Sequence, residues 1–153
     1  MTLRSSLQLA AVLIALSAAA ASCAGDPTGV GPKALRIANA EAKWKSVGVT
    51  SYSFTSTIGC YCLDTYTGAM MVTVTQGRVT SIVDVRTGAS RPLSYRQPID
   101  SLFALLKTEL LERPELLTAT FDDKLGFPNR ISFGDQALDA GGVITIADVV
   151  TIP

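Results

Sequence analysis

Residues 70–85 of the chain read MMVTVTQGRVTSIVDV, and this stretch predicts an antiparallel β-hairpin. Apolar residues alternate with polar ones on both sides of Gln76-Gly77. That period of two is typical of strands with one buried face. Gly77 can adopt the positive φ that a tight hairpin turn requires, so the two strands are expected to pair directly.

The same periodicities extend outward from this hairpin in both directions. Apolar residues three and four positions apart predict amphipathic helices, and strict alternation predicts further strands. Asp100 or Ser101 is expected to cap the second helix, and Pro114 to close it. We expect helices at 33–45 and 100–113, and strands at 52–58, 70–75, 79–85, 117–121, 131–133 and 143–152.

The order of these elements, αβββαβββ, predicts an α+β fold. About six antiparallel strands would form one sheet, with both helices packed on one face. The opposite face would then be open and rich in hydroxyl groups. Its expected members are Ser53, Thr55, Thr73, Thr75, Thr118 and Thr120.

The N-terminal 22 residues predict a signal peptide for export. Arg4 precedes an apolar stretch, residues 7–21, that is too short to span a bilayer and ends in small residues. Two cleavage sites fit. An ordinary signal peptidase could cut after any of residues 19–21, whereas Ala20-Ala21-Ser22-Cys23 is similar to a bacterial lipobox. In the second case Cys23 becomes the first residue of the mature chain and carries a lipid.

The cysteine count favours lipid attachment at Cys23. Three cysteines are an odd number for an exported protein, and lipidation of Cys23 leaves Cys60 and Cys62 as a pair. Residues 23–32 are rich in Gly and Pro and predict a flexible tether. Residues 33–153 then form one domain. We expect it to be held by lipid at a bacterial cell envelope membrane, facing the periplasm or the exterior.

Seven short features of the chain stand out together: Cys23, Trp44, 51–54 (SYSF), 60–62 (CYC), 77–79 (GRV), 102–103 (LF) and 125–131 (LGFPNRI). As a set they resemble a family of small bacterial lipoproteins catalogued as domain of unknown function 6174. The resemblance covers roughly residues 33–152. In that family the Cys-x-Cys pair and the Gly-aromatic-Pro turn recur, and no activity is established, so the resemblance implies no catalytic residue.

Cys60 and Cys62 are the chemically distinctive pair of the domain, and three roles fit them. An oxidising compartment favours a disulfide, although Cα atoms two residues apart in a strand are about 6.5 Å apart, near the upper limit for a bridge. Gly59 would allow the necessary bend. A redox site is the second role, since a strained bridge is easily reduced. Zinc is the third, but two thiolates are only half of a four-ligand site, and the chain has no His.

The remaining polar residues give no clear sign of catalysis. Without His, the chain lacks the commonest general base, and no nucleophile elbow, P-loop or dinucleotide-binding glycine pattern occurs. Zero net charge argues against nucleic-acid binding. Acidic loop residues invite a calcium interpretation, but their spacing does not match a calcium loop, and turn capping is the simpler role. They are Asp122, Asp123, Asp135 and Asp139, while Glu109, Glu112 and Glu115 are expected on a solvated helix face.

We therefore expect a membrane-tethered, non-enzymatic domain without a cofactor or metal, serving as a binding or envelope-structural module. The open sheet face is the expected docking surface for a protein partner. Binding there is expected to be weak, because the face has few aromatic anchors. The alternative function is a thiol-disulfide redox protein that uses Cys60 and Cys62.

Overall fold

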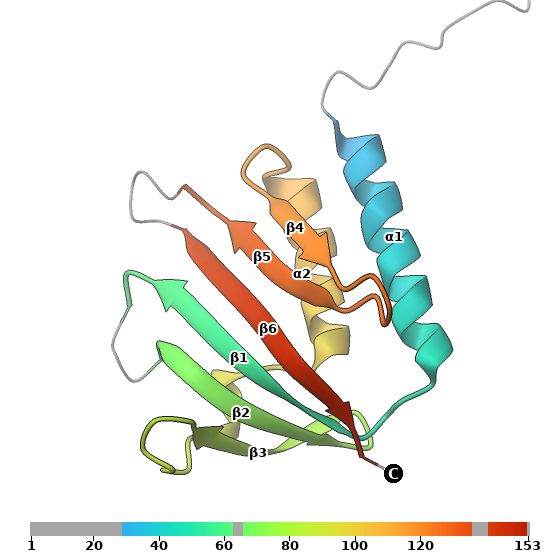
Figure 1. The fold of residues 1–153 in the computed structure, drawn as a ribbon. Helices are drawn as coiled ribbons and strands as arrows, with labels where there is room; N and C mark the ends of the chain where they lie inside the picture. Colours follow the sequence, from blue (N-terminus) through green and yellow to red (C-terminus); the bar gives the residue numbers. More distant parts are fainter. Residues whose placement is uncertain (1–28, 63–65, 136–140, 153) are drawn as a thin grey trace, which may run out of the picture.

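The computed structural model describes residues 29–62, 66–135 and 141–152 (Figure 1). Two α-helices, six strands and one short 3₁₀ helix follow in the order αβββαβββ, which confirms the predicted α+β class. The elements are α1 (Val30–Val47), β1 (Tyr52–Cys60), β2 (Gly68–Thr75), β3 (Arg78–Asp84), η1 (Leu93–Tyr95), α2 (Ile99–Glu112), β4 (Thr118–Phe121), β5 (Pro128–Phe133) and β6 (Gly142–Thr151).

The six strands form one antiparallel sheet in the order β3-β2-β1-β6-β5-β4. Each half of the chain supplies a three-stranded meander, and the pairing of β1 with β6 joins the two halves. In Figure 1 α2 lies behind the sheet and α1 lies beside its β4 edge, so the face toward the viewer is uncovered. The predicted 70–85 hairpin is present, and Gln76 and Gly77 both have positive φ in its turn.

One hydrophobic core fills the space between the sheet and the helices. Its largest fully buried side chains include Tyr52, Phe54 and Phe103. Trp44 from α1 contacts Tyr52 edge to face, with ring centroids 5.2 Å apart. This contact fixes the C-terminal half of α1 against β1, because aromatic pairs in such geometry add to the energy of burial.

Helix α1 also covers the edge strand β4. Lys33 donates hydrogen bonds to the carbonyl oxygens of Pro114 and Leu117, at 2.5 and 3.0 Å. Arg36 donates to the carbonyl oxygen of Ala119, at 3.4 Å. These two cations therefore satisfy backbone acceptors along an edge that could otherwise pair with another chain.

Strand β3, at the opposite edge, is partly covered by the segment that follows it. Val83 bridges to Ser90, and the amide of Asp84 donates to the carbonyl oxygen of Ala89 at 2.9 Å. The Asp84 carboxylate accepts hydrogen bonds from Arg91 at 2.7 Å and from the amide of Thr87 at 3.0 Å. The segment between β3 and α2 is thus an ordered strap that also contains η1.

Both helices start earlier than predicted. Helix α1 takes in residues 30–32, which sequence analysis assigned to the tether, and Gly29 precedes it with φ 64°. Helix α2 begins at Ile99 after Pro98, which has no side-chain capping hydrogen bond, and the Ile99 amide donates to the Tyr52 hydroxyl instead. The expected capping by Asp100 or Ser101 is therefore wrong, because the fixed φ of Pro98 already sets the entry to the helix. Neither described helix is both long and apolar enough to cross a membrane.

The expectation of a solvated face for Glu109 is also wrong. Glu109 is 7% exposed, and its carboxylate oxygens accept hydrogen bonds from the Arg113 guanidinium at 3.1 and 3.3 Å. A carboxylate tolerates this burial because the cation one helical turn later pairs with it. Glu112 and Glu115 are exposed, as expected.

Candidate functional site

The Cys60-Tyr61-Cys62 turn lies where β1 leaves the sheet. Cys60 is the last residue of the strand and pairs with Gly142 of β6. The two sulfur atoms are in contact, and the Cα atoms are 5.3 Å apart. The bend makes this Cα–Cα distance shorter than in an extended strand and brings it into the range in which a disulfide can form. Tyr61 is 86% exposed at the tip of the bend.

Arg96 anchors the chain that returns from this turn to β2. Its guanidinium donates hydrogen bonds to the carbonyl oxygens of Tyr66, Gly68 and Tyr95, at 3.0, 3.1 and 2.8 Å. The rings of Tyr66 and Tyr95, two of the residues whose carbonyls bind Arg96, stack on each other with centroids 4.4 Å apart. The start of β2 is thereby joined to the segment that leads into α2. Tyr66 and Tyr95 are 29 positions apart, and nothing in the sequence indicated that their rings contact each other.

Arg96 is a buried cation held by neutral acceptors. It is 5% exposed, and among the described residues its hydrogen-bond partners are the backbone carbonyls of Tyr66, Gly68 and Tyr95. Burial lowers the pKa of its guanidinium. A charge in such a place is costly unless it is paired or hydrogen-bonded. The buried Nε atom has no hydrogen-bond partner among the described residues, so the donor set is not fully used there.

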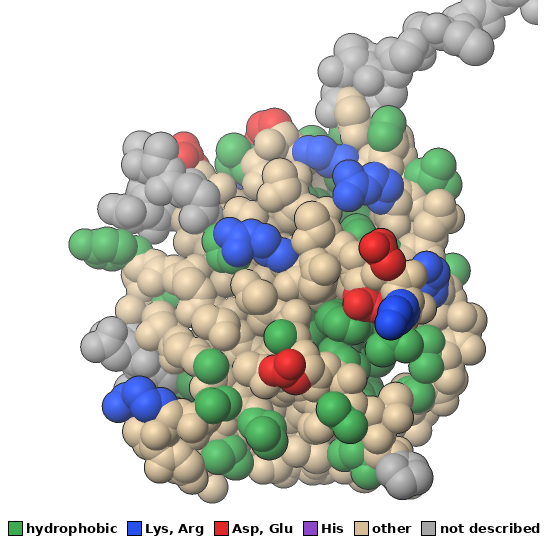
Figure 2. All heavy atoms as spheres, in the orientation of Figure 1, with side chains coloured by type: hydrophobic (Ala, Val, Ile, Leu, Met, Phe, Trp, Pro, Cys, Tyr) green, Lys and Arg blue, Asp and Glu red, His purple; other side chains and the backbone are tan. Residues whose placement is uncertain are grey.

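The predicted open face of the sheet is confirmed by the strand register. Ser53 lies opposite Thr73, Thr118 opposite Ser132, and Thr120 opposite Arg130. These positions alternate with buried ones in β1 and β2 and with half-buried ones in β4. Figure 2 shows this face, which has few charged side chains over the central strands. Its hydroxyl-bearing members in the structure are Ser53, Thr55, Thr57, Thr73, Thr75, Ser81, Thr118, Thr120, Ser132 and Thr145.

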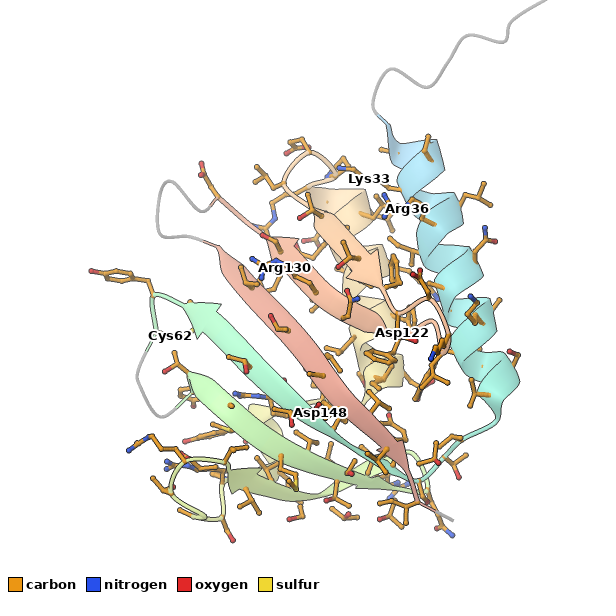
Figure 3. All side chains as sticks on the ribbon, viewed as in Figure 1. Lys33, Arg36, Cys62, Asp122, Arg130 and Asp148 are labelled. Carbon is orange, nitrogen blue, oxygen red and sulfur yellow. A yellow bond between two sulfur atoms is a disulfide. The ribbon has the colours of Figure 1, made fainter. Side chains whose placement is uncertain are left out.

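Two charged residues interrupt this neutral surface. Arg130 pairs in register with Thr145 of β6, and Asp148 occupies a bulge where β6 shifts register against β1. Asp148 has φ 53°, a conformation that Asp tolerates better than most residues. Figure 3 places both side chains on the face toward the viewer. Sequence analysis did not single out either residue for this face.

The four acidic loop residues do not share one role: Asp123 is exposed in the turn that follows β4, and Asp135 is half-buried after β5. The Asp122 carboxylate accepts hydrogen bonds from the amides of Lys124 and Leu125, which confirms its turn-capping role. Asp139 lies outside the described residues. Within the described part of the chain, no group of three or more Cys, Asp and Glu side chains could hold a metal ion.

Several predicted features cannot be placed in the structure. The signal peptide, Cys23 and residues 24–28 of the tether lie outside the described residues. The disulfide between Cys60 and Cys62 in an exported protein stays a prediction, although the sulfur contact is compatible with it. Arg96 could not have been found from the sequence, because a lone Arg in a polar stretch usually lies on the surface.

The observed architecture defines the class of protein. It is an α+β domain with two helices on one face of a six-stranded antiparallel sheet, an uncovered Ser- and Thr-rich face, and a Cys-x-Cys turn at one end. The chain belongs to a family of unknown function, DUF6174, whose model matches residues 36–151. This match spans the whole sheet, all of α2 and residues 36–47 of α1. No curated protein and no solved structure matches the chain.

Proposed function

We propose that the chain is a bacterial lipoprotein, anchored through Cys23, whose domain binds a protein partner in the cell envelope. The observation that carries the proposal is the uncovered face of the sheet, a broad neutral surface built from all six strands. An unoccupied, ordered sheet face is a common place for a partner to dock. No catalytic role is proposed for it.

The position of the lipid anchor in the sequence supports this proposal. Residues 23–28 precede Gly29, where α1 begins, and six residues can span at most about 20 Å. The start of α1 would therefore stay close to the membrane surface. Figure 1 shows that α1 begins beside the β4 edge, so an anchor at this end leaves the open face accessible.

The chemistry of the open face predicts weak, transient binding. Strong interfaces usually contain a cluster of buried Trp, Tyr or Arg anchors. Here the face offers hydroxyl groups, the half-exposed Met71 and the charged side chains of Arg130 and Asp148. Hydroxyl groups form neutral hydrogen bonds with modest net energies, so we expect fast exchange with the partner.

Site-specific photocrosslinking in intact envelopes tests the proposed docking surface. A photoreactive residue replaces Thr55 or Thr145, which lie on neighbouring strands in the middle of the face. The control carries the same residue at Ala42, an exposed position on α1. We expect a discrete crosslinked protein from the sheet positions and none from Ala42. Equal crosslinking from both surfaces would contradict the proposal.

The redox function is a second candidate because the two cysteine sulfurs meet at an exposed turn. A disulfide used in exchange has to be accessible to an attacking thiolate, and Cys62 is exposed. Equilibration of the complete chain with glutathione buffers measures the potential of the pair. Resistance to glutathione favours a structural bridge. Ready reduction, together with isomerisation of a scrambled substrate, favours the redox function.

A further inference from the structure

A cavity of about 110 Å³ lies on the covered side of the sheet, between β1, β6 and the start of α2. Ile58 and Ile144 from the strands and Leu102 and Leu105 from α2 form its apolar walls. Arg96 lines the same cavity. The sheet separates this space from the open face, so the two surfaces would bind different ligands.

Arg96 supplies the cavity with a cation whose hydrogen-bonding capacity is only partly used. A guanidinium has five N–H donors, and three hydrogen bonds join Arg96 to carbonyl oxygens. The Nε donor is buried and, among the described residues, has no hydrogen-bond partner, as is also true of the Arg91 Nε. Most buried polar groups in proteins are satisfied, so this unused donor on a cavity-lining side chain is available to a ligand.

Two further features of the cavity favour an anion. Ser56 is 2% exposed and brings a hydroxyl group to a wall that is otherwise apolar on the sheet side. The first two turns of α2 contribute Leu102 and Leu105, so the positive end of the helix dipole lies beside the cavity. Asp100, the acidic residue of that first turn, is exposed and does not line the cavity.

We propose that this cavity binds a carboxylate that carries a short aliphatic chain. The carboxylate would pair with the Arg96 guanidinium and accept a hydrogen bond from Ser56, and the chain would lie against Leu102, Leu105 and the two isoleucines. Paired guanidinium and carboxylate groups form strong, directional hydrogen bonds. A ligand of this kind would supply the negative charge that the described partners of Arg96 lack.

The size of the cavity limits the ligand. An engineered apolar cavity of about 150 Å³ accommodates benzene, so about 110 Å³ suits a chain of three or four carbons with its carboxylate. Two sources fit the same chemistry: a short free carboxylic acid, or the carboxyl end of a fatty acid whose tail leaves through the mouth of the cavity. Butyrate and octanoate distinguish these sources.

Methyl NMR on the complete chain, purified from envelopes in an uncharged detergent, tests the proposal. We expect butyrate to shift the methyl signals of Ile58, Leu102, Leu105 and Ile144 in a saturable way, with half-saturation in the millimolar range. Butan-1-ol and butylammonium share the carbon chain but lack the carboxylate, and are expected to cause no saturable shift. The exposed Leu35 and Leu111 serve as internal reference signals.

Two variants locate the binding site. Arg96→Lys keeps the charge but loses the planar donor set, and we expect affinity for butyrate to fall at least about tenfold. Leu105→Trp fills the cavity from a half-buried helix position and is expected to abolish binding. Leu35→Trp adds the same ring at an exposed position of α1 and is expected to bind butyrate as the wild type does.

The outcomes separate the proposal from a purely structural role of Arg96. Tighter binding of octanoate would identify a fatty acid end, and equal or weaker binding would identify a short acid; both support the proposal. Absence of a saturable shift with either acid up to about 50 mM would overturn it. Equal methyl shifts with butan-1-ol would overturn it as well, and so would undiminished butyrate binding by Leu105→Trp. If Arg96→Lys does not fold, Leu105→Trp still tests the proposal.

Discussion

Gly126 lies directly against the backbone of Ala40. A Cβ atom at Gly126 would be 2.5 Å from the carbonyl oxygen of Ala40 and 2.8 Å from the Cβ of Lys43. The next residue, Phe127, contacts Trp44 edge to face with ring centroids 6.4 Å apart. The turn between β4 and β5 therefore docks on α1, and glycine at this position permits the close approach.

Gly126→Ala is expected to destabilise the domain through both strain and steric conflict. Gly126 has φ 82°, so alanine would cost about 1–2 kcal/mol for the backbone alone, and the conflict with Ala40 adds to this. Gly88→Ala is the matched control, since Gly88 has φ 70° with nothing within 4 Å of the added atom. Urea denaturation measures both changes in the free energy of unfolding. If both variants lower the free energy of unfolding equally, the close approach to Ala40 does not restrict the residue at position 126.

Tyr52→Phe is expected to lower the free energy of unfolding by about 1–2 kcal/mol. The Tyr52 hydroxyl accepts a hydrogen bond from the amide of Ile99 at 3.0 Å, at the first turn of α2. Phenylalanine fills the same space but leaves this buried amide without a partner. Tyr61→Phe, at an exposed position, is the control and is expected to be neutral. Identical urea midpoints for the two variants would contradict the prediction.

The same tyrosine predicts a loss of stability in alkali. Burial raises the pKa of Tyr52 to about 12, against about 10 in the unfolded chain. Between these values the folded state binds more protons than the unfolded state, so stability falls as the pH rises from about 10 to about 12. The Tyr52→Phe variant lacks this contribution, and its alkaline loss of stability is expected to be shallower.

Asp84 is expected to make the stability of the β3 edge sensitive to acid. The Arg91 guanidinium, and next the amide of Thr87, lower the pKa of Asp84 to about 2. Because the folded pKa lies below the unfolded value of about 3.9, this stabilisation is present above about pH 4 and is lost as the pH falls toward 2. The melting temperatures of the wild type and Asp84→Asn are therefore expected to converge in acid. Asp123→Asn, on an exposed turn, is the control. A difference in melting temperature between the wild type and Asp84→Asn that stays constant down to about pH 2.5 would refute the prediction.

The Cys60–Cys62 disulfide is predicted to be present in the exported protein and to contribute little stability. Thiol counting on the denatured, unreduced chain checks its presence, and two free thiols besides Cys23 would exclude it. A ring closed by residues two apart restricts the unfolded chain little, so Cys60→Ser is expected to cost less than about 2 kcal/mol. Cys62→Ser is the matched variant, and it is expected to have the same effect.

Cys23→Ser is expected to release the protein from the membrane fraction. The prediction depends on the apolar stretch at 7–21, the small residues before Cys23 and the glycine-rich segment after it. Intact mass spectrometry of the mature chain is expected to show a lipid on an N-terminal Cys23. An unmodified N-terminus at Ser22 or Cys23 would rule out the lipid anchor. Cys60→Ser, which leaves Cys23 unchanged, is the control for general effects of losing a cysteine.

Much of the candidate site followed from local patterns, and part of it did not. The open face was predicted because Thr73 and Thr75 alternate with Val72 and Val74, and a strand places alternate residues on opposite faces. The roles of Arg96 and Glu109 were missed. Their burial depends on carbonyl groups and a cation that the fold brings to them, and no local pattern records this.

The sequence by itself determined the order αβββαβββ and the 70–85 hairpin, because helix and strand periodicities are written within a dozen neighbouring residues. Only the tertiary structure decided that β1 pairs with β6, and that α1 covers the β4 edge through Lys33 and Arg36. These contacts join segments more than 80 residues apart, as the separations of 84 and 83 residues in the α1 hydrogen bonds show. Such contacts depend on which surfaces remain to be buried once every element has formed, which is a property of the whole chain.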